Sequence, residues 1–176
     1  FFGPDRLWLN DGSGTFSDSG LVLDGGFGSV ALLAPLDSGT SLDLFLVRHL
    51  GANQVWFNDG LGLLTESGQA IGVATSRSGG ALGDLDGDGD LDAFVPTSTN
   101  LEPNRVFVND GAGVFSDSGQ SLGTSQSRWV ALGDLDGDGD LDAFVGNNGA
   151  NKTYRNDGTG SFTETAAQRQ AGYVSA

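Results

Sequence analysis

A three-residue motif, Asn-Asp-Gly, occurs four times at nearly constant spacing and constrains the fold more than any other feature of the chain. Its copies begin at residues 10, 58, 109 and 156, so successive copies are 48, 51 and 47 residues apart. These residue types tolerate the positive φ angles of tight hairpin turns, so each copy predicts two antiparallel strands joined at the motif. An aromatic residue precedes each asparagine by two positions, and we expect all four in the core: Trp8, Trp56, Phe107 and Tyr154.

An acidic segment repeats with the same period. The sequence Leu-Gly-Asp-Leu-Asp-Gly-Asp-Gly-Asp-Leu-Asp-Ala-Phe-Val covers residues 82–95 and recurs unchanged at 132–145, and a degenerate copy covers 33–46. Short apolar runs flank each copy, which predicts one strand before and one strand after the acidic loop. Each repeat therefore holds four short strands, and four-stranded sheets repeated at about 40–50 residues are typical of β-propeller blades. We predict an all-β fold, a β-propeller of four-stranded antiparallel blades.

The repeat boundaries divide the chain into three complete units and one split unit. We expect a single propeller domain or propeller segment over residues 1–176, with repeats at roughly 1–27 (partial), 28–76, 77–126, 127–172 and 173–176 (partial). Phe1-Phe2-Gly3 matches the end of the second strand of a unit, and residues 173–176 match the start of a first strand. Either these ends pair to complete a fourth blade, or the chain is a piece of a longer array.

Composition excludes several classes of protein. The chain has 23 acidic and 8 basic residues, a net charge of −15, so nucleic acid and anionic membranes are poor partners. It contains no cysteine and one histidine, His49, which excludes disulfides, zinc–thiolate sites and clustered histidine sites. No apolar run approaches the ~18–20 residues of a membrane span, so membrane insertion is not expected.

Aspartates at alternate positions of the two intact loops are the candidate metal ligands. Five carboxylates within nine residues repel one another, so such a loop needs a cation or full solvation. Ligands that are all oxygen suit calcium rather than zinc. We predict two calcium sites, with Asp90 and Asp140 binding through backbone carbonyls and the others through carboxylates; the alternative is a solvated acidic turn. The ligand sets are Asp84, Asp86, Asp88, Asp90 and Asp92 in one loop and Asp134, Asp136, Asp138, Asp140 and Asp142 in the other.

Two related patterns are expected not to be strong calcium sites. The degenerate loop keeps only Asp37 and Asp43, while proline, glycine and serine replace three of the other carboxylates. We therefore expect weak binding there or none. An EF-hand is excluded because the twelfth position of the intact loops is Val95 or Val145 instead of glutamate.

The acidic loop followed by Asn-Asp-Gly-x-Gly-x-Phe resembles the FG-GAP/VCBS repeat family over essentially the whole chain. That family builds calcium-binding β-propellers in integrin α-subunits, bacterial surface proteins and some fungal lectins. The pair Phe27-Gly28 is not followed by Gly-Ala-Pro, so the chain is similar to the bacterial-type branch. Family propellers usually have more repeats than are visible here. The resemblance therefore implies either a monomer closed by its terminal strands or a homodimer that completes a larger ring.

The leading functional hypothesis is a non-enzymatic, calcium-stabilised propeller module for extracellular recognition or adhesion, with a glycan or a cell-surface protein as partner. A loop that wraps its ion leaves little room for the open coordination positions of a catalytic metal. Calcium sites of extracellular modules are tuned to high ambient calcium, which favours a secreted or cell-surface location.

Two alternatives stay open. One is a fragment of a polysaccharide-acting enzyme built on an integrin-like propeller, although one His, two Tyr and a single Lys weigh against it. The other is a purely structural repeat segment of a surface protein. The connections that vary between repeats, at 48–51, 97–102 and 147–151, are candidate contact loops, and their alternative is ordinary solvated loops. Trp129 is a further candidate for contact or for packing between blades.

Overall fold

The computed structural model describes residues 5–23, 30–49, 51–72, 79–99 and 101–165. Within these ranges the chain forms fourteen strands in one two-stranded and three four-stranded antiparallel sheets. The described residues include no helix long and apolar enough to cross a membrane. The predicted all-β fold of four-stranded antiparallel blades is therefore confirmed.

The strands follow the predicted repeat along the chain. The two-stranded sheet comes first and is followed by the three four-stranded sheets in chain order. The strand bounds are β1 (Asp5–Asn10), β2 (Phe16–Leu23), β3 (Val30–Ala34), β4 (Asp43–Val47), β5 (Gln54–Asn58), β6 (Leu64–Glu66), β7 (Ala81–Gly83), β8 (Asp92–Val95), β9 (Arg105–Asn109), β10 (Phe115–Asp117), β11 (Ser127–Gly133), β12 (Asp142–Asn147), β13 (Lys152–Asn156) and β14 (Phe162–Glu164).

Each four-stranded sheet is a meander whose strand order is its chain order. The acidic loops join the first strand of a sheet to the second, and the Asn-Asp-Gly turns join the third to the fourth. In every hairpin the asparagine pairs directly with the residue six positions later, as Asn109 does with Phe115. The hairpins predicted from the motif are thus present with one common register.

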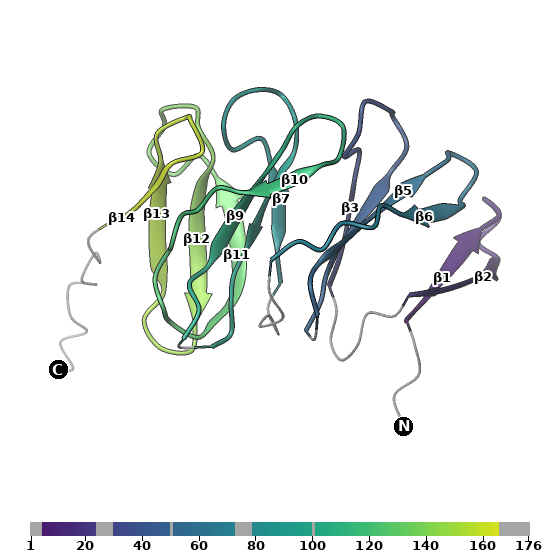
Figure 1. Ribbon diagram of the computed structural model, residues 1–176, viewed down its shortest axis with the longest axis horizontal. Coiled ribbons are helices and arrows are strands. Elements are labelled where there is room, and N and C mark those ends of the chain that lie inside the picture. The colour runs from purple at the N-terminus through teal and green to yellow at the C-terminus, as the bar shows by residue number, and fades with distance from the viewer. Residues whose placement is uncertain (1–4, 24–29, 50, 73–78, 100, 166–176) are drawn as a thin grey trace, which may run out of the picture.

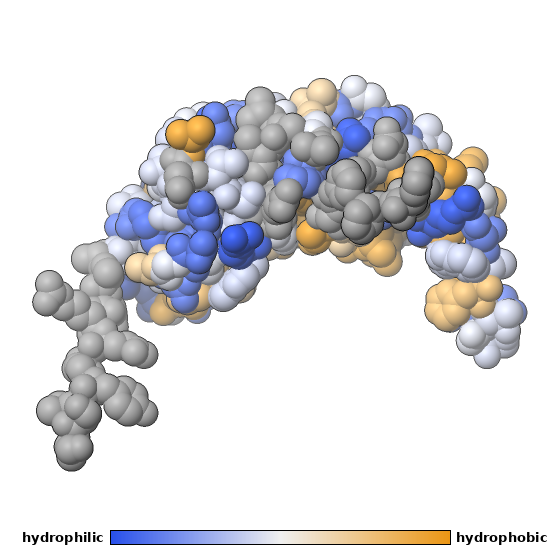
Figure 2. Space-filling model, turned by 90° about the horizontal axis from the view of Figure 1, so that it is seen from below, coloured by the Kyte–Doolittle hydropathy of each residue, from blue (hydrophilic) through white to orange (hydrophobic). Residues whose placement is uncertain are grey.

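The sheets stand side by side along an arc, with the β1–β2 sheet at one end and the β11–β14 sheet at the other (Figure 1). The first strands β3, β7 and β11 contact one another in succession, so the sheets converge at their first strands as propeller blades do. Seen from below, the described part of the molecule curves as an open arch (Figure 2). Residues 1–3 and 173–176, whose pairing is one of the two alternatives for the split unit, lie outside the described residues.

Among the described residues the apolar core consists of three clusters, one between each pair of neighbouring sheets. Alternate residues of β4 supply two of them, since Leu44 and Leu46 face the β1–β2 sheet while Phe45 and Val47 face the β7–β10 sheet. The third cluster joins Phe94 of β8 to Tyr154 of β13. All five residues of β4 are buried because neighbouring sheets cover both faces of the strand, and all of them except Asp43 are apolar.

One core prediction is wrong. Phe107 and Tyr154 are 2% and 1% exposed and Trp56 is half-buried, but Trp8 is 55% exposed. Phe107 packs with Phe45, and Tyr154 with Phe94, so each aromatic residue faces the sheet that precedes its own. Trp8 is exposed because no described sheet precedes β1–β2.

Candidate metal centre

The two intact acidic loops fold in the same way because glycine lets the backbone curl back on itself. Gly87 and Gly89 have φ angles of 80° and 97°, a region that side chains with a Cβ rarely enter. The Asp84 carboxylate accepts hydrogen bonds from the backbone N–H groups of both glycines, at 2.8 and 3.1 Å. Asp134 accepts the equivalent pair in the second loop. The first aspartate therefore closes the loop and fixes its curvature.

Three carboxylates converge in each loop. Oxygen atoms of Asp84, Asp86 and Asp88 all lie within 4.8 Å of one another, and those of Asp134, Asp136 and Asp138 do the same. Partial burial, with the neighbouring charges of Asp88 and Asp84, raises the pKa of Asp86. A donor set of hard carboxylate oxygens that repel one another fits calcium in its chemistry. These two triads, named here the first and second triad, are the groups that would hold an ion.

The fourth aspartate of each loop lies apart from the triad. The Asp90 carboxylate sits against the backbone of Gly111, in the Asn-Asp-Gly turn of its own sheet, and Asp140 sits in the same way against Gly158. Calcium binding by the backbone carbonyls of Asp90 and Asp140 stays a prediction.

The fifth aspartate has a structural role that the sequence analysis missed. Asp92 is fully buried, and its carboxylate accepts hydrogen bonds from the N–H groups of Leu85 at 2.9 Å and Asn109 at 2.8 Å. It thereby ties the acidic loop to the Asn-Asp-Gly hairpin of the same sheet. Burial raises the pKa of Asp92 to about 6, and the nearby charges of Asp86 and Asp88 add to the shift.

The same arrangement occurs in all three four-stranded sheets. Asp142 accepts from the N–H groups of Leu135 and Asn156, and Asp43 accepts from those of Leu36 and Asn58. Asp43 belongs to the degenerate loop, which contributes no acidic triad among the described residues. The sequence signal for a role beyond metal binding was that Asp43 is kept in a loop that has lost most of its other aspartates. Calcium ligation by Asp92 and Asp142 stays a prediction beside this structural role.

The asparagines of the last two turns also link neighbouring sheets. The Asn109 side-chain amide donates to the carbonyl of Leu91 in its own sheet, at 3.2 Å, and to that of Leu36 in the preceding sheet, at 2.9 Å. Asn156 makes the equivalent bonds to Leu141 and Leu85. Asn109 and Asn156 therefore each fasten the acidic loop of their own sheet to the acidic loop of the preceding sheet.

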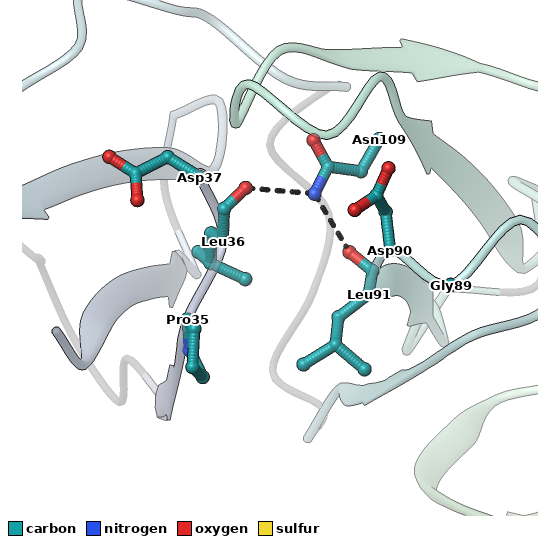
Figure 3. A pocket seen from close by; sticks show the side chains of 7 residues that line it. All are labelled: Pro35, Leu36, Asp37, Gly89, Asp90, Leu91 and Asn109. Atoms are coloured by element: carbon teal, nitrogen blue, oxygen red, sulfur yellow. Dashed lines mark hydrogen bonds between the residues drawn. The ribbon is translucent and has the colours of Figure 1, made fainter. Parts of the chain in front are cut away.

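A cleft of about 250 Å³ separates the degenerate loop from the first intact loop. Asn109 bridges its two walls through the hydrogen bonds drawn in Figure 3, and the carboxylates of Asp37 and Asp90 flank the opening. The cleft thus combines apolar walls with acceptor oxygens. Its lining residues are Pro35, Leu36, Asp37, Gly89, Asp90, Leu91 and Asn109.

The candidate contact loops use much of their polar surface internally. The Thr97 hydroxyl donates to the carbonyl of Glu102 at 2.6 Å, and the Asn147 side chain donates to that of Ala150 at 2.9 Å. Leu50 and Asn100 lie outside the described residues. Trp129 is half-exposed and packs against Phe144, with ring centroids 5.6 Å apart. The loops at 97–102 and 147–151 are therefore stabilised by hydrogen bonds of their own.

The chain is similar to proteins whose repeats and structures are known. A family model described as an FG-GAP-like repeat matches residues 40–95, 97–145 and 134–174. A solved lectin from Agrocybe aegerita, described as recognising non-reducing terminal N-acetylglucosamine, has a TM-score of 0.57 and 20% identity to this chain. The match covers 90% of this chain and 44% of the lectin, so the chain spans less than half the lectin's length. No curated protein matches the chain.

At 20% identity the lectin shows the fold alone, whereas the repeat matches cover well over half of the sequence. The two intact acidic loops and the last three Asn-Asp-Gly hairpins lie within the matched residues. The chain therefore belongs to the FG-GAP-like repeat family.

Proposed function

We propose that the chain is a non-enzymatic propeller module, stabilised by two calcium ions, that recognises a carbohydrate outside the cell. The observation that carries the proposal is the duplicated triad, Asp84, Asp86 and Asp88 in one loop and Asp134, Asp136 and Asp138 in the next. Two converging carboxylate sets on a fold of this family favour bound ions over freely solvated turns.

The proposed role of calcium is to hold each sheet together at its acidic loop. The loop joins the first two strands of a sheet, and Asp92 links it to the third. An ion that binds only the folded loop adds about 2.7 kcal/mol when calcium is present at a hundredfold excess over its dissociation constant. Weak sites of this kind suit the high calcium concentrations outside cells, which supports a secreted or surface location.

The second part of the proposal is carbohydrate recognition, which the similarity to a lectin propeller supports. The cleft beside the first triad offers what a sugar ring needs, because the carboxylates of Asp37 and Asp90 can accept bonds from hydroxyl groups. Pro35 and Leu91 provide an accessible apolar surface for the ring. The internally bonded contact loops offer fewer unused polar groups, so we place the candidate site in the cleft.

Thermal unfolding with and without calcium, combined with a glycan array, tests both parts. We expect calcium to raise the melting temperature of the wild-type chain, Asp88→Asn or Asp138→Asn to remove part of that rise, and the double variant to remove most of it. An array that includes glycans ending in N-acetylglucosamine tests recognition. No effect of calcium would overturn the stabilising role. If calcium stabilises the chain but no glycan binds, the alternative of a purely structural repeat segment is favoured. If the chain cleaves an acidic polysaccharide, it is an enzyme.

A further inference from the structure

The two intact loops offer an internal comparison because residues 82–95 and 132–145 are identical. Any difference between the two sites in cation affinity must therefore come from the residues around them. The structure shows that these surroundings differ in two ways, in the cover supplied by a neighbouring sheet and in charge.

The first loop lies beneath the Asn-Asp-Gly turn of the following sheet. Asn156 donates to the carbonyl of Leu85 at 2.7 Å, and a Cβ atom on Gly160 would lie 3.3 Å from the Cβ of Asp86. Asp84 and Asp86 are half-buried as a result, whereas Asp134 and Asp138 of the second triad are exposed and the Asp136 side chain, against Arg155, is 15% exposed. No described sheet follows β11–β14, so the second loop has no equivalent cover.

The second loop has a cation of its own in contact with it. Arg155 of β13 places its Nη1 atom 2.9 Å from Oδ2 of Asp136, the central aspartate of the second triad. The equivalent position of the preceding sheet, one residue before the asparagine of the turn, is Val108. The guanidinium therefore neutralises part of the second triad, and the first triad has no such group from this position.

We propose that Arg155 is a built-in competitor that makes the second triad the weaker calcium site, so that the two identical loops fill at different calcium concentrations. The inference rests on the proposed calcium binding. To bind three carboxylates of the second loop, a divalent ion has to displace the guanidinium from Asp136 or to bind beside its positive charge. Either route costs affinity that the first loop keeps, by about fivefold for an ion pair worth about 1 kcal/mol.

The consequence is a graded response along the arc. The first loop is held between two sheets and keeps its ion as calcium falls, while the second loop, on the terminal sheet, loses its ion first. Arg155 can then return to Asp136, so part of the stabilisation that the ion gave is retained by the ion pair. The terminal sheet becomes the part of the molecule that responds to calcium concentration.

Isothermal titration with calcium chloride on single-site proteins tests the inference. Asp138→Asn leaves only the first triad intact, and Asp88→Asn leaves only the second. We expect tighter binding in the Asp138→Asn protein. Adding Arg155→Gln to the Asp88→Asn protein should raise its calcium affinity by up to about fivefold, whereas Arg155→Lys, which keeps the charge, should change it much less. Arg155→Gln in the Asp138→Asn protein is the matched control and should leave the affinity of the first loop unchanged.

The possible results separate this inference from the proposed function. If neither single-site protein binds calcium, the calcium proposal itself fails. If both bind with equal affinity, or if Arg155→Gln leaves the second site unchanged, the role of Arg155 is overturned while calcium binding stands. The Arg155 side chain is 58% exposed, so its substitution should not disturb folding.

Discussion

At the scale of single residues, the buried aspartate that ends each acidic loop has a structural role that does not depend on metal binding. Asp43 makes the same two hydrogen bonds as Asp92 and Asp142, although the degenerate loop around it has lost the triad. We expect Asp43→Ala to lower the free energy of unfolding by about 2–4 kcal/mol, because it leaves the N–H groups of Leu36 and Asn58 without their acceptor.

Urea unfolding in calcium-free buffer measures this loss. Asp37→Ala is the matched control, since Asp37 stands in the same loop and its bond from the Gly39 N–H is exposed. It should cost less than about 1 kcal/mol. Equal losses for the two variants would contradict the structural role of Asp43.

The raised pKa of Asp92 also predicts how the stability of the calcium-free protein depends on pH. Burial raises its pKa from 3.8 to about 6, so between these values the folded chain holds a proton that the unfolded chain releases. This contribution to stability is complete below about pH 4 and is lost as pH rises through 6, with a cost of up to about 3 kcal/mol.

The free energy of unfolding at pH 4.5 and pH 7, measured without calcium, tests the sign. It should fall between these values, whereas saturating calcium should reverse the trend because an ion requires deprotonated carboxylates. Below about pH 4 the lowered pKa values of Asp11, Asp18 and Asp157 act in the opposite direction, and their stabilisation is lost as the pH falls. Rising stability from pH 4.5 to 7 without calcium would contradict the assignment to Asp92.

At the scale of elements, the Asn-Asp-Gly hairpins pack against one another through their second glycine. Gly113 has a φ of +77°, and a Cβ atom there would meet the ring of Phe57 in the preceding sheet, 2.7 Å from Cζ. Gly14 is the same position of the first hairpin, with a φ of +91° and no atom within 4 Å. The pair therefore separates backbone strain from the contact between sheets.

We expect Gly14→Ala to cost about 1–2 kcal/mol of unfolding free energy through strain alone. Gly113→Ala should cost about 1–3 kcal/mol more, because the new methyl group pushes against a packed side chain. Chemical unfolding of the two variants measures the difference. If both variants lose the same unfolding free energy, the Phe57 side chain moves away from the new methyl group at no measurable cost.

The hairpins, the four-stranded sheets and the positions of the acidic loops could be predicted from the sequence because each depends on local pattern and repeats three or four times. The roles of Asp92 and Asn109 could not, because their partners lie in other strands and in the neighbouring sheet. The position of Arg155 beside Asp136 also depends on how β13 pairs with β12. Spacing along the chain identified which residues matter but not which groups they contact.

At the scale of the whole molecule, the described part of the arc leaves apolar side chains exposed on the face that it presents at each end. Trp8 and Phe16 are exposed on the first sheet, although Phe107 and Phe115 at the equivalent positions are buried. At the other end Leu135 is 55% exposed, whereas the equivalent Leu85 is buried. Interior sheets cover such faces with each other, so both ends of the described arc resemble halves of the interface that holds neighbouring sheets together. Large uncovered apolar faces favour association.

We therefore expect this chain to self-associate as its concentration rises, through these end faces. Sedimentation velocity in calcium-containing buffer should show the average mass increasing with concentration, and Trp8→Ser with Phe16→Ser should weaken that increase. Leu61→Ser is the control, because Leu61 is exposed at a turn and its loss should have no such effect. A discrete dimer would favour two chains that complete one larger ring. A chain that stays monomeric at every concentration would contradict the prediction and favour closure by residues near its own termini.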